Sequence, residues 1–399
     1  MSGIGRREFI GAGTALLAAS GIAQEKKIQG FDEKDPGALA DVAWTPFSDR
    51  KVRVGIAGEG VCAFGSAFGF QNHPNVEVVA CTDLDPERCK LLQSRVKAKR
   101  TYPSCQEMIA KEKELDAVYI ATDAPSHVEL AIMALDHGLH VASAVPAILG
   151  REQLEFIPKL LEAVKRSGKV YQMNETTAFR PQCFEMRKLY EAGAFGELVY
   201  TEGEYWHHGP STGGVGSYNG WRNGLPPQYY PTHSNGFYTC VTHKRFTEVT
   251  CMGKPSTQVR YLRSNRYDNN PFGTEIALFR TEEGGMARMA VCWDIPSDGG
   301  EIGRCWGQKA FYTKDRYAGP NELVKGVQRK KPNLPPGVPA GDHGGSHGYL
   351  MDDFIRAILL GKKPEVDVIT ALNTTVSGIY AHLSAVKGGE TLKIPSFSL

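Results

Sequence analysis

The sequence lacks several features that would mark a specialised class of protein. After residue 23 no apolar run approaches the length of a membrane span. Lysine and arginine number 46 against 44 aspartates and glutamates, and this net charge of +2 gives no reason to expect nucleic acid or an anionic membrane as partner. The nine cysteines include no C-x-x-C pair and stand singly, often inside apolar runs, which predicts buried thiols rather than disulfides or a zinc site.

The N-terminus differs from the rest of the chain. Arg6 and Arg7 directly precede the apolar stretch 9–23, which is too short for a stable membrane anchor and ends in the small residues Gly21 and Ala23. This pattern resembles a twin-arginine export signal. We therefore expect residues 1–23 to be a signal peptide and the mature protein to be periplasmic, with an ordinary secretory signal or an uncleaved anchor as alternatives.

The remaining chain divides into an arm and two domains. Residues 24–50 mix charge with proline and glycine and have no apolar periodicity, so we expect an extended arm. Residues 51–175 alternate short apolar runs with helical spacing, as in a parallel sheet with helical crossovers. Residues 176–399 contain several alternating strand-like runs and a helix at 348–361, which predicts an α/β domain with a mostly antiparallel open sheet.

A dinucleotide-binding pattern opens the first domain. Gly58 and Gly60 follow the run "VRVGIA", and Ala63 occupies the third small-residue position. Such glycines let the backbone approach a pyrophosphate at the start of the next helix. Asp83 ends the second strand, where a carboxylate binds the ribose hydroxyls and repels a 2′-phosphate. The pattern favours NAD over NADP, although Arg88 nearby leaves NADP open.

Several longer segments carry a family resemblance. "VGIAGEG", "VEVVACTDLDPER", "LDAVYIATDAPSHVELAIMALDHGLHV", "GAFGEL" and "FIRAILLGKKPEVD" together resemble the Gfo/Idh/MocA oxidoreductases over residues 51–399. That resemblance implies a doubly wound Rossmann domain joined to an α/β domain whose open sheet mediates oligomers, so a homodimer or homotetramer is expected. It also implies that Thr122, His127 and Pro146 lie along the cofactor.

One position departs from the usual pattern of that family. Where its members carry E-K-P after the fifth strand, this chain has Ala144, Val145 and Pro146, so no lysine is present. The NAD-dependent glycoside hydrolases of family 109 typically carry E-V-P there, and "GELVYTEGEYWHHG" and "YYPTHSNG" resemble their segments. The chain departs from that branch at Ala144 and matches its E-N pair only loosely at Asn174-Glu175.

The candidate catalytic residues lie in those two segments. His233 in "YPTH" suits proton transfer near neutral pH, unless it caps the helix that begins near Ser234, and Tyr230 is placed to line the same site. We expect His207 and His208 to face opposite ways, so that one of them, assigned here to His208, reaches the cleft.

Three further groups of residues are less specific. His343 and His347 are too few for a zinc site and favour a substrate-binding loop, and no metal is expected. Tyr205, Trp206 and Trp221 would stack on a sugar face or belong to the core. The sequence therefore leaves their contribution to a carbohydrate site open.

These observations leave three functions open. They are an NAD-dependent glycosidase that works through a transient 3-keto sugar, a sugar oxidoreductase of the same family, and a non-catalytic sugar-binding protein. Outside the cytoplasm little free NAD would replace what a net oxidation consumes. A closed redox cycle needs no replacement, so export favours the glycosidase.

Overall fold

The computed structural model describes residues 35–399 except 61, 209–216, 263 and 297–299, so the expected signal peptide lies outside the described residues. The strands are β1 (Val52–Ala57), β2 (Val76–Thr82), β3 (Arg100–Tyr102), β4 (Ala117–Ile120), β5 (His140–Ser143), β6 (Tyr171–Met173), β7 (Leu198–Trp206), β8 (Phe246–Pro255), β9 (Phe272–Thr281), β10 (Met286–Cys292), β11 (Glu301–Gly307), β12 (Phe311–Thr313), β13 (Arg316–Ala318) and β14 (Leu392–Lys393). The helices are α1 (Phe64–Ala67), α2 (Pro86–Val96), α3 (Cys105–Lys111), α4 (His127–Asp136), α5 (Ile157–Ser167), α6 (Pro181–Glu191), α7 (Thr232–Thr242), α8 (Val259–Leu262), α9 (His347–Leu360) and α10 (Val368–Val386).

The first sheet has the doubly wound Rossmann arrangement. Its six strands lie in the order β3-β2-β1-β4-β5-β6, and every neighbouring pair is parallel. β1 and β4 are mostly apolar, and β1, β4 and β5 are almost wholly buried because helices cover both faces. The strand order reverses between β1 and β4, which opens a crevice at their carboxyl ends.

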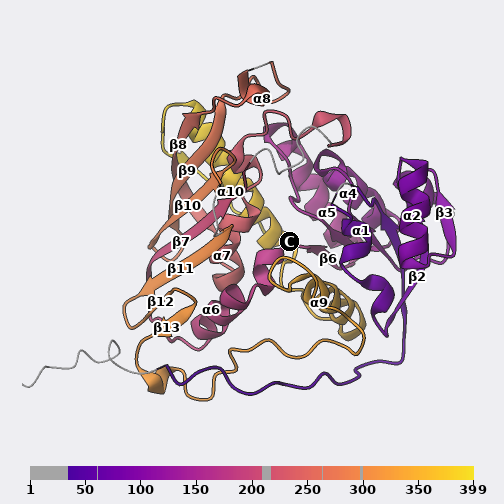
Figure 1. The fold of residues 1–399 in the computed structure, drawn as a ribbon, viewed down its shortest axis with the longest axis horizontal. Helices are drawn as coiled ribbons and strands as arrows, with labels where there is room; N and C mark the ends of the chain where they lie inside the picture. The colour runs from indigo at the N-terminus through magenta and orange to yellow at the C-terminus, as the bar shows by residue number, and fades with distance from the viewer. Residues whose placement is uncertain (1–34, 61, 209–216, 263, 297–299) are drawn as a thin grey trace, which may run out of the picture.

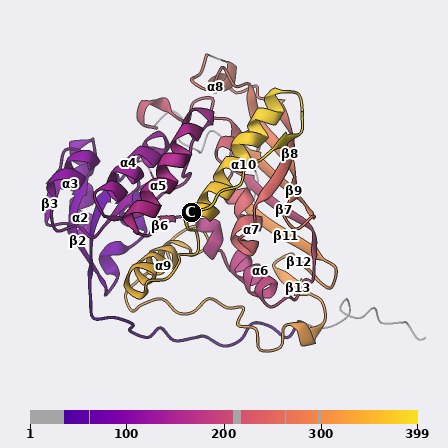
Figure 2. The same cartoon turned by 180° about the vertical axis from the view of Figure 1, so that it is seen from behind.

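The second sheet is mixed and mostly antiparallel. Its eight strands lie in the order β13-β12-β11-β7-β10-β9-β8-β14, and β7 and β10 form a parallel pair within it. α7 and α10 cover one face, while the other face is turned away from the Rossmann domain (Figures 1 and 2). The expected fold class is therefore confirmed.

The open face of the second sheet follows from strict alternation along the strands. In β9 the even-numbered Ile276 and Leu278 are exposed, whereas Ala277 and Phe279 are buried under the helices. Met252 on β8 and Met286 on β10 are exposed on neighbouring strands. This face thus carries a band of apolar side chains.

Two helices near the C-terminus connect the domains. α9 ends at Gly361, which has φ 64°, as a glycine helix cap does. Although it follows the second sheet in sequence, α9 packs on the Rossmann domain, where the Leu350 carbonyl accepts a hydrogen bond from Gln172 Nε2 at 2.8 Å. The sequence analysis did not predict α10, the longest helix of the described chain.

The described part of the arm, residues 35–50, has no helix or strand and runs along both domains (Figure 1). Asp35 pairs with the buried Arg329 of the second domain at 2.7 Å. At the other end, the Asn75 side chain donates to the carbonyls of Ser48 and Arg50 at 2.7 and 2.8 Å. The arm is therefore attached to each domain by polar contacts. No helix within the described residues is long and apolar enough to cross a membrane.

Candidate active site

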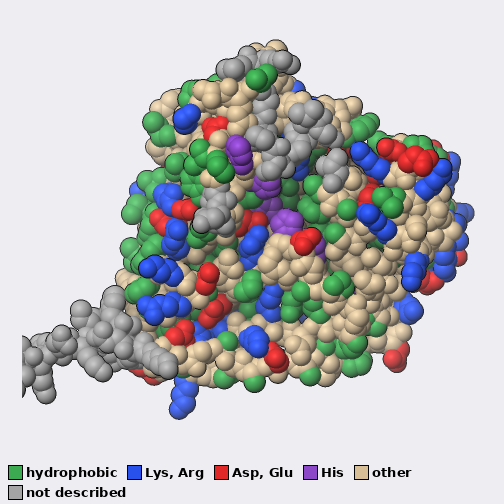
Figure 3. Space-filling view, viewed as in Figure 1, with side chains coloured by type: hydrophobic (Ala, Val, Ile, Leu, Met, Phe, Trp, Pro, Cys, Tyr) green, Lys and Arg blue, Asp and Glu red, His purple; other side chains and the backbone are tan. Residues whose placement is uncertain are grey.

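A pocket lies between the two domains at the carboxyl ends of β1, β2, β4 and β5. From the Rossmann domain it is lined by the expected Gly58, Gly60, Asp83, Thr122 and His127. From the second domain it is lined by Tyr218, Trp221, Arg222 and Tyr230. Figure 3 shows histidine side chains in the hollow between the two halves of the molecule.

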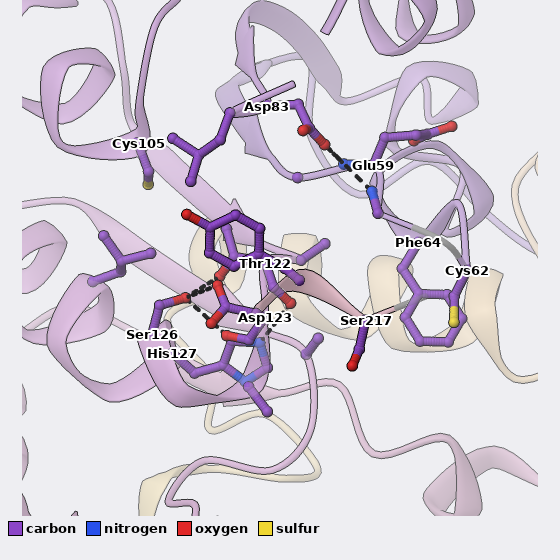
Figure 4. Close-up of a pocket in the computed structure, with 18 of the residues that line it drawn as sticks. Glu59, Cys62, Phe64, Asp83, Cys105, Thr122, Asp123, Ser126, His127 and Ser217 are labelled. Carbon is purple, nitrogen blue, oxygen red and sulfur yellow. Dashed lines mark hydrogen bonds between the residues drawn. The ribbon is translucent and has the colours of Figure 1, made fainter. Parts of the chain in front are cut away.

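The turn after β1 is shaped for close approach of a ligand. Gly58 and Gly60 have φ of 91° and 59°, a region that side chains with a Cβ rarely adopt. A Cβ on Gly58 would lie 2.5 Å from the Ala121 carbonyl oxygen, while the space around Gly60 is open. Asp83 Oδ2 accepts the N–H groups of Glu59 and Gly60 at 2.8 and 3.3 Å (Figure 4). These residues therefore fit a dinucleotide.

The helix that follows this turn differs from expectation. α1 has four residues, because the glycine-rich segment around it stops the helix before Gly69 at φ 77°. Ala63 adopts a left-handed φ of 52° and does not line the pocket, whereas Cys62 and Phe64 beside it do. Gly65 is the small residue that packing requires, since its Cβ would lie 2.3 Å from the Gly58 carbonyl oxygen. The cradle is thus formed mainly by the turn itself.

Glu59 is a part of this cradle that the sequence analysis missed. Its carboxylate is buried and accepts the Ser66 N–H at 3.0 Å and the Ser66 hydroxyl at 2.8 Å. It also pairs with Arg95 of α2. Glu59 therefore ties the turn to both flanking helices.

The nicotinamide end of such a ligand would lie near the end of β4. Thr122 Oγ1 lies 2.7 Å from Ser126 Oγ, at the opposite end of the pocket from Asp83 (Figure 4). His127 is buried, and its Nδ1 and Nε2 lie 3.0 and 3.2 Å from the carbonyl oxygens of Pro146 and Thr122. Burial lowers the pKa of His127, so its ring is neutral near pH 7. The ring bridges the ends of β4 and β5. Pro146 therefore contributes to the pocket indirectly, through the contact between its carbonyl oxygen and His127.

The segment after β5 offers no ionisable group to the pocket. Ala144 and Val145 both line it and are both almost completely buried. The peptide bond between Val145 and Pro146 is cis. The segment after β5 therefore supplies no proton-transfer group at the position of the family lysine.

The second domain supplies a tyrosine with a histidine behind it. Tyr230 lines the pocket, and the ring of His233 lies behind it with 5.6 Å between ring centroids. α7 begins at Thr232, so His233 is inside the helix and is not its N-cap. Its Nδ1 lies 2.9 Å from Glu175 Oε1, and Glu175 is itself completely buried. The sequence analysis named Glu175 but assigned it no role.

The surroundings of His233 set its charge. Burial lowers the pKa of His233, but the carboxylates of Glu175 and Glu301 outweigh burial and place it above the usual value. Burial raises the pKa of Glu175, but the charge of His233 and its hydrogen bonds lower it further, so that it ends below the usual value. These surroundings therefore favour the charged pair of an imidazolium and a carboxylate over the neutral pair.

The aromatic candidates separate onto two faces of the second sheet. Tyr205 packs edge-on against His233 at 4.7 Å and against Trp293 at 5.5 Å. Trp206, its neighbour on β7, is on the opposite face and donates to Glu204 at 2.9 Å, so it does not reach the site. Trp221 lines the pocket, where Arg222 lies over its ring at 4.3 Å.

His207 packs against this cluster, and the assignment of a catalytic role to His208 stays a prediction. The His207 ring packs against Tyr205 at 5.5 Å and Trp293 at 6.5 Å. Both histidines follow the last residue of β7, so strand alternation does not determine their directions. Burial lowers the pKa of His207, which keeps its ring neutral.

His343 in the loop before α9 and His347, the first residue of α9, approach the site. His343 Nδ1 lies 2.9 Å from His347 Nε2, and the His343 ring stacks 6.2 Å from that of His233. Burial lowers the pKa of His343 to about 3. No group of three or more His, Cys, Asp or Glu suited to a metal occurs among the residues that the structure describes.

Comparison with known proteins gives two kinds of relative. The family described as "Oxidoreductase family, NAD-binding Rossmann fold" matches residues 52–175. A glycosyl hydrolase family 109 protein of Bacteroides fragilis is 32% identical over 50% of this chain and 45% of its own length. One from Streptomyces niveus is 24% identical over 90% of this chain and 80% of its own length. The chain thus spans less than half the length of the first of these relatives.

Solved structures show the same fold at low identity. A scyllo-inositol dehydrogenase from Lactobacillus casei, solved with NAD(H) and scyllo-inositol, has a TM-score of 0.64 at 15% identity, covering 86% of this chain and 99% of its own. The WlbA dehydrogenase from Bordetella pertussis, solved with NADH and UDP-GlcNAcA, has a TM-score of 0.67 at 18% identity, covering 88% and 99%. At these identities the likeness concerns the fold alone.

Proposed function

Because residues 52–175 belong to the Gfo/Idh/MocA oxidoreductase family, with family 109 glycosyl hydrolases among the relatives of the chain, we propose an NAD-dependent enzyme that cleaves glycosides without net oxidation. One observation carries the proposal: the Glu175–His233 pair lies behind Tyr230 at a pocket where Val145 replaces the family lysine. The pocket thus offers an acid–base group beside a dinucleotide cradle.

The residues of the cradle fit NAD. Gly58 lets the turn pass close to Ala121, Gly60 leaves open space for the pyrophosphate, and Asp83 places a carboxylate where the adenosine ribose would lie. Bound NAD would supply reversible hydride transfer at C3 of a sugar, and the resulting ketone would make the C2 proton acidic. The NAD-binding character of the domain agrees with its family.

The protein would supply the proton transfers. A base would take the C3 hydroxyl proton as the hydride leaves, and a base would then remove the C2 proton while the C1 substituent leaves with a proton from an acid. Water would add across the double bond to give the 3-keto sugar, and return of the hydride with a proton would give the free sugar. His233 and Tyr230 are the candidate groups, because Ala144 and Val145 carry no ionisable atom. Burial raises the pKa of Tyr230, so this phenol is a proton donor at neutral pH and becomes a base only after losing its proton.

The test is an assay of purified mature protein without added cofactor. Denaturation should release NAD(H), and a panel of 4-nitrophenyl glycosides should include at least one that is hydrolysed. If no glycoside is cleaved but added sugars reduce the bound NAD, the protein is a sugar oxidoreductase. If neither occurs, the protein is a sugar-binding protein and the proposal is wrong.

Two further features belong to this proposal. The N-terminal pattern with Arg6 and Arg7 supports export to the periplasm by the twin-arginine route, which carries folded proteins with their cofactors. The apolar band on the open sheet supports a homo-oligomer in which this face pairs with a second copy. The substrate is a small carbohydrate, since the pocket combines aromatic rings with a few polar groups.

A further inference from the structure

Four charged side chains form an alternating chain through the protein interior. His233 Nδ1 lies 2.9 Å from Glu175 Oε1 and 4.0 Å from Glu301 Oε2. Glu301 pairs in turn with Arg180, whose Nη2 donates to Oε1 at 2.6 Å. The side chains of Glu175, His233 and Glu301 are at most 5% exposed, and that of Arg180 is 18% exposed. Water therefore screens these charges weakly.

The sum of charges in this group depends on His233. Two carboxylates, one guanidinium and one imidazolium sum to zero, whereas a neutral His233 leaves one buried negative charge without compensation. A buried unpaired charge is costly, so this environment favours the protonated ring. Arg180 lowers the pKa of His233, because its positive charge neutralises Glu301 and weakens the hold of the carboxylates on the proton.

Among the residues that the structure describes, the other groups packed on His233 supply no competing charge at short range. Tyr205 and Tyr230 pack on it from β7 and from the loop before α7, and burial raises the pKa of both phenols. His343 stacks on it from the loop before α9, and His207 lies beyond Tyr205, with their pKa values lowered by burial. Each of these four groups is neutral near pH 7. Arg222 is more distant from His233, because its guanidinium lies over the ring of Tyr230, 5.3 Å from the ring centroid.

We propose that Glu175 and the Arg180–Glu301 pair are positioning residues that hold His233 as an imidazolium with its Nδ1–H directed at Glu175. The remaining proton, on Nε2, is then the one that can be given to a substrate. His233 therefore acts as an acid while it holds this proton, and acts as a base once the Nε2 proton has left to solvent. This use of the proton rests on the proposed function, whereas the charge state of the ring does not.

The test measures that charge state directly and needs neither substrate nor cofactor. Protein with ¹⁵N-labelled histidine is titrated by long-range ¹H–¹⁵N NMR, and the His233 signal among the 11 histidines is assigned by its loss in His233→Gln. In the wild type the ring should be doubly protonated at pH 7. In Glu175→Gln its pKa should fall by about one unit or more, since a carboxylate within 4 Å raises a histidine pKa by roughly that amount.

Two matched variants determine whether the Arg180–Glu301 pair raises or lowers the pKa of His233. Arg180→Gln removes the compensating charge of Glu301 and should raise the pKa of His233. The double variant Arg180→Gln/Glu301→Gln removes a neutral pair and should return the pKa close to the wild-type value. A role in packing alone would shift the pKa of His233 alike in all variants, or in none, and far-ultraviolet circular dichroism confirms that each variant is folded.

Three results would overturn the proposal. They are a neutral His233 at pH 7 in the wild type, an unchanged pKa in Glu175→Gln, and a lowered pKa in Arg180→Gln. If Arg180→Gln does not fold, the titrations of the wild type and of Glu175→Gln test the proposal. If the titrations agree but Glu175→Gln leaves glycoside turnover and its pH profile unchanged, the positioning stands and the proposed function is wrong.

Discussion

Asp353 Oδ2 of α9 accepts the backbone N–H of Glu365 at 2.7 Å, which ties α9 to the segment that follows it. Burial raises the pKa of this carboxyl to about 7, and the nearby carboxylates of Glu365 and Asp352 act in the same direction. Because the unfolded chain would lose this proton near pH 4, the folded state holds it over the interval from about pH 4 to 7. The contribution of Asp353 to stability therefore falls as the pH rises through that interval.

Asp353→Asn should remove that dependence and keep an acceptor for the Glu365 N–H. Relative to the wild type, its free energy of unfolding should be higher at pH 8 by about 1 kcal/mol or more, with a smaller or no gain at pH 5. Urea unfolding at the two pH values measures the difference. Asp352→Asn is the matched control, since it loses contacts with His73 at 3.1 Å and Arg356 at 2.7 Å and should destabilise the protein. Equal effects of Asp353→Asn at both pH values would refute this explanation.

Asp83 should determine the choice and affinity of the dinucleotide. Asp83→Ala removes the acceptor for the Glu59 and Gly60 amides as well as the expected ribose partner, so NAD affinity should fall about 10- to 100-fold. The ratio of NADP to NAD affinity should rise, because the repulsion of a 2′-phosphate is lost. Calorimetric titration of protein stripped of nucleotide measures both. Asp85→Asn is the control, because asparagine also caps α2 and should keep NAD affinity.

Substitution of Val145 tests whether the absence of the family lysine limits glycoside hydrolysis. If His233 and Tyr230 serve the proton transfers, Val145→Lys should not increase hydrolysis of any accepted glycoside. A lysine there would also place a charge where Val145 is now 7% exposed, so bound NAD should be measured alongside turnover. A large gain in hydrolysis would instead mean that the pocket of this chain had lost its principal catalytic group.

The open sheet face should control assembly. Ile276 and Leu278 are 41% and 49% exposed on β9, beside Met286 at 46%. Ile276→Asp with Leu278→Asp places charge in the proposed interface and should give a monomer by light scattering after size exclusion. The fold should be kept, because both side chains point away from the core. A wild type that is already monomeric would contradict the proposed homo-oligomer.

Much of the Rossmann domain could be predicted from the sequence because its signals are local. The run "VRVGIA" followed by Gly58 and Gly60 fixes a strand and a turn with positive φ, and Asp83 at the end of β2 returns to that turn. The length of α1 was not predictable from the glycine pattern alone. Gly65 lies inside α1 and is required by packing against Gly58, whereas Gly69, with its left-handed backbone, reverses the chain after one helical turn.

The second domain was harder to predict from the sequence, because tertiary contacts determine its helices and its site. α10 has the sequence "VITALNTTVSGIYAHLSAV", whose threonines, valines and glycine favour strand or turn. It is a helix because Asp367 caps its first turn and almost every side except the last turn is buried. Glu175 is a similar case. Its role depends on His233, which lies 58 positions further along the chain, and no local pattern indicates such a pair.

His233 should carry protons while the dinucleotide carries hydride. His233→Ala should therefore keep NAD affinity and reduce glycoside turnover by roughly 10²- to 10⁴-fold, the usual range for a general acid–base group. Thr176→Ala is a control nearby, because its hydroxyl lies 3.4 Å from His233 Nδ1 and the Glu175 contact remains. A His233→Ala protein that releases no NAD would show a structural role instead.

The most direct test of the redox-neutral mechanism follows a label at C2. A glycoside that the enzyme accepts, deuterated at C2, is hydrolysed in ordinary water, and the free sugar is analysed by mass spectrometry and NMR. Elimination through a ketone predicts that the deuterium is lost to solvent during cleavage, with a primary isotope effect if C2 deprotonation limits the rate. If the sugar is released with its C2 deuterium intact, cleavage occurs by direct displacement, and the central claim is contradicted.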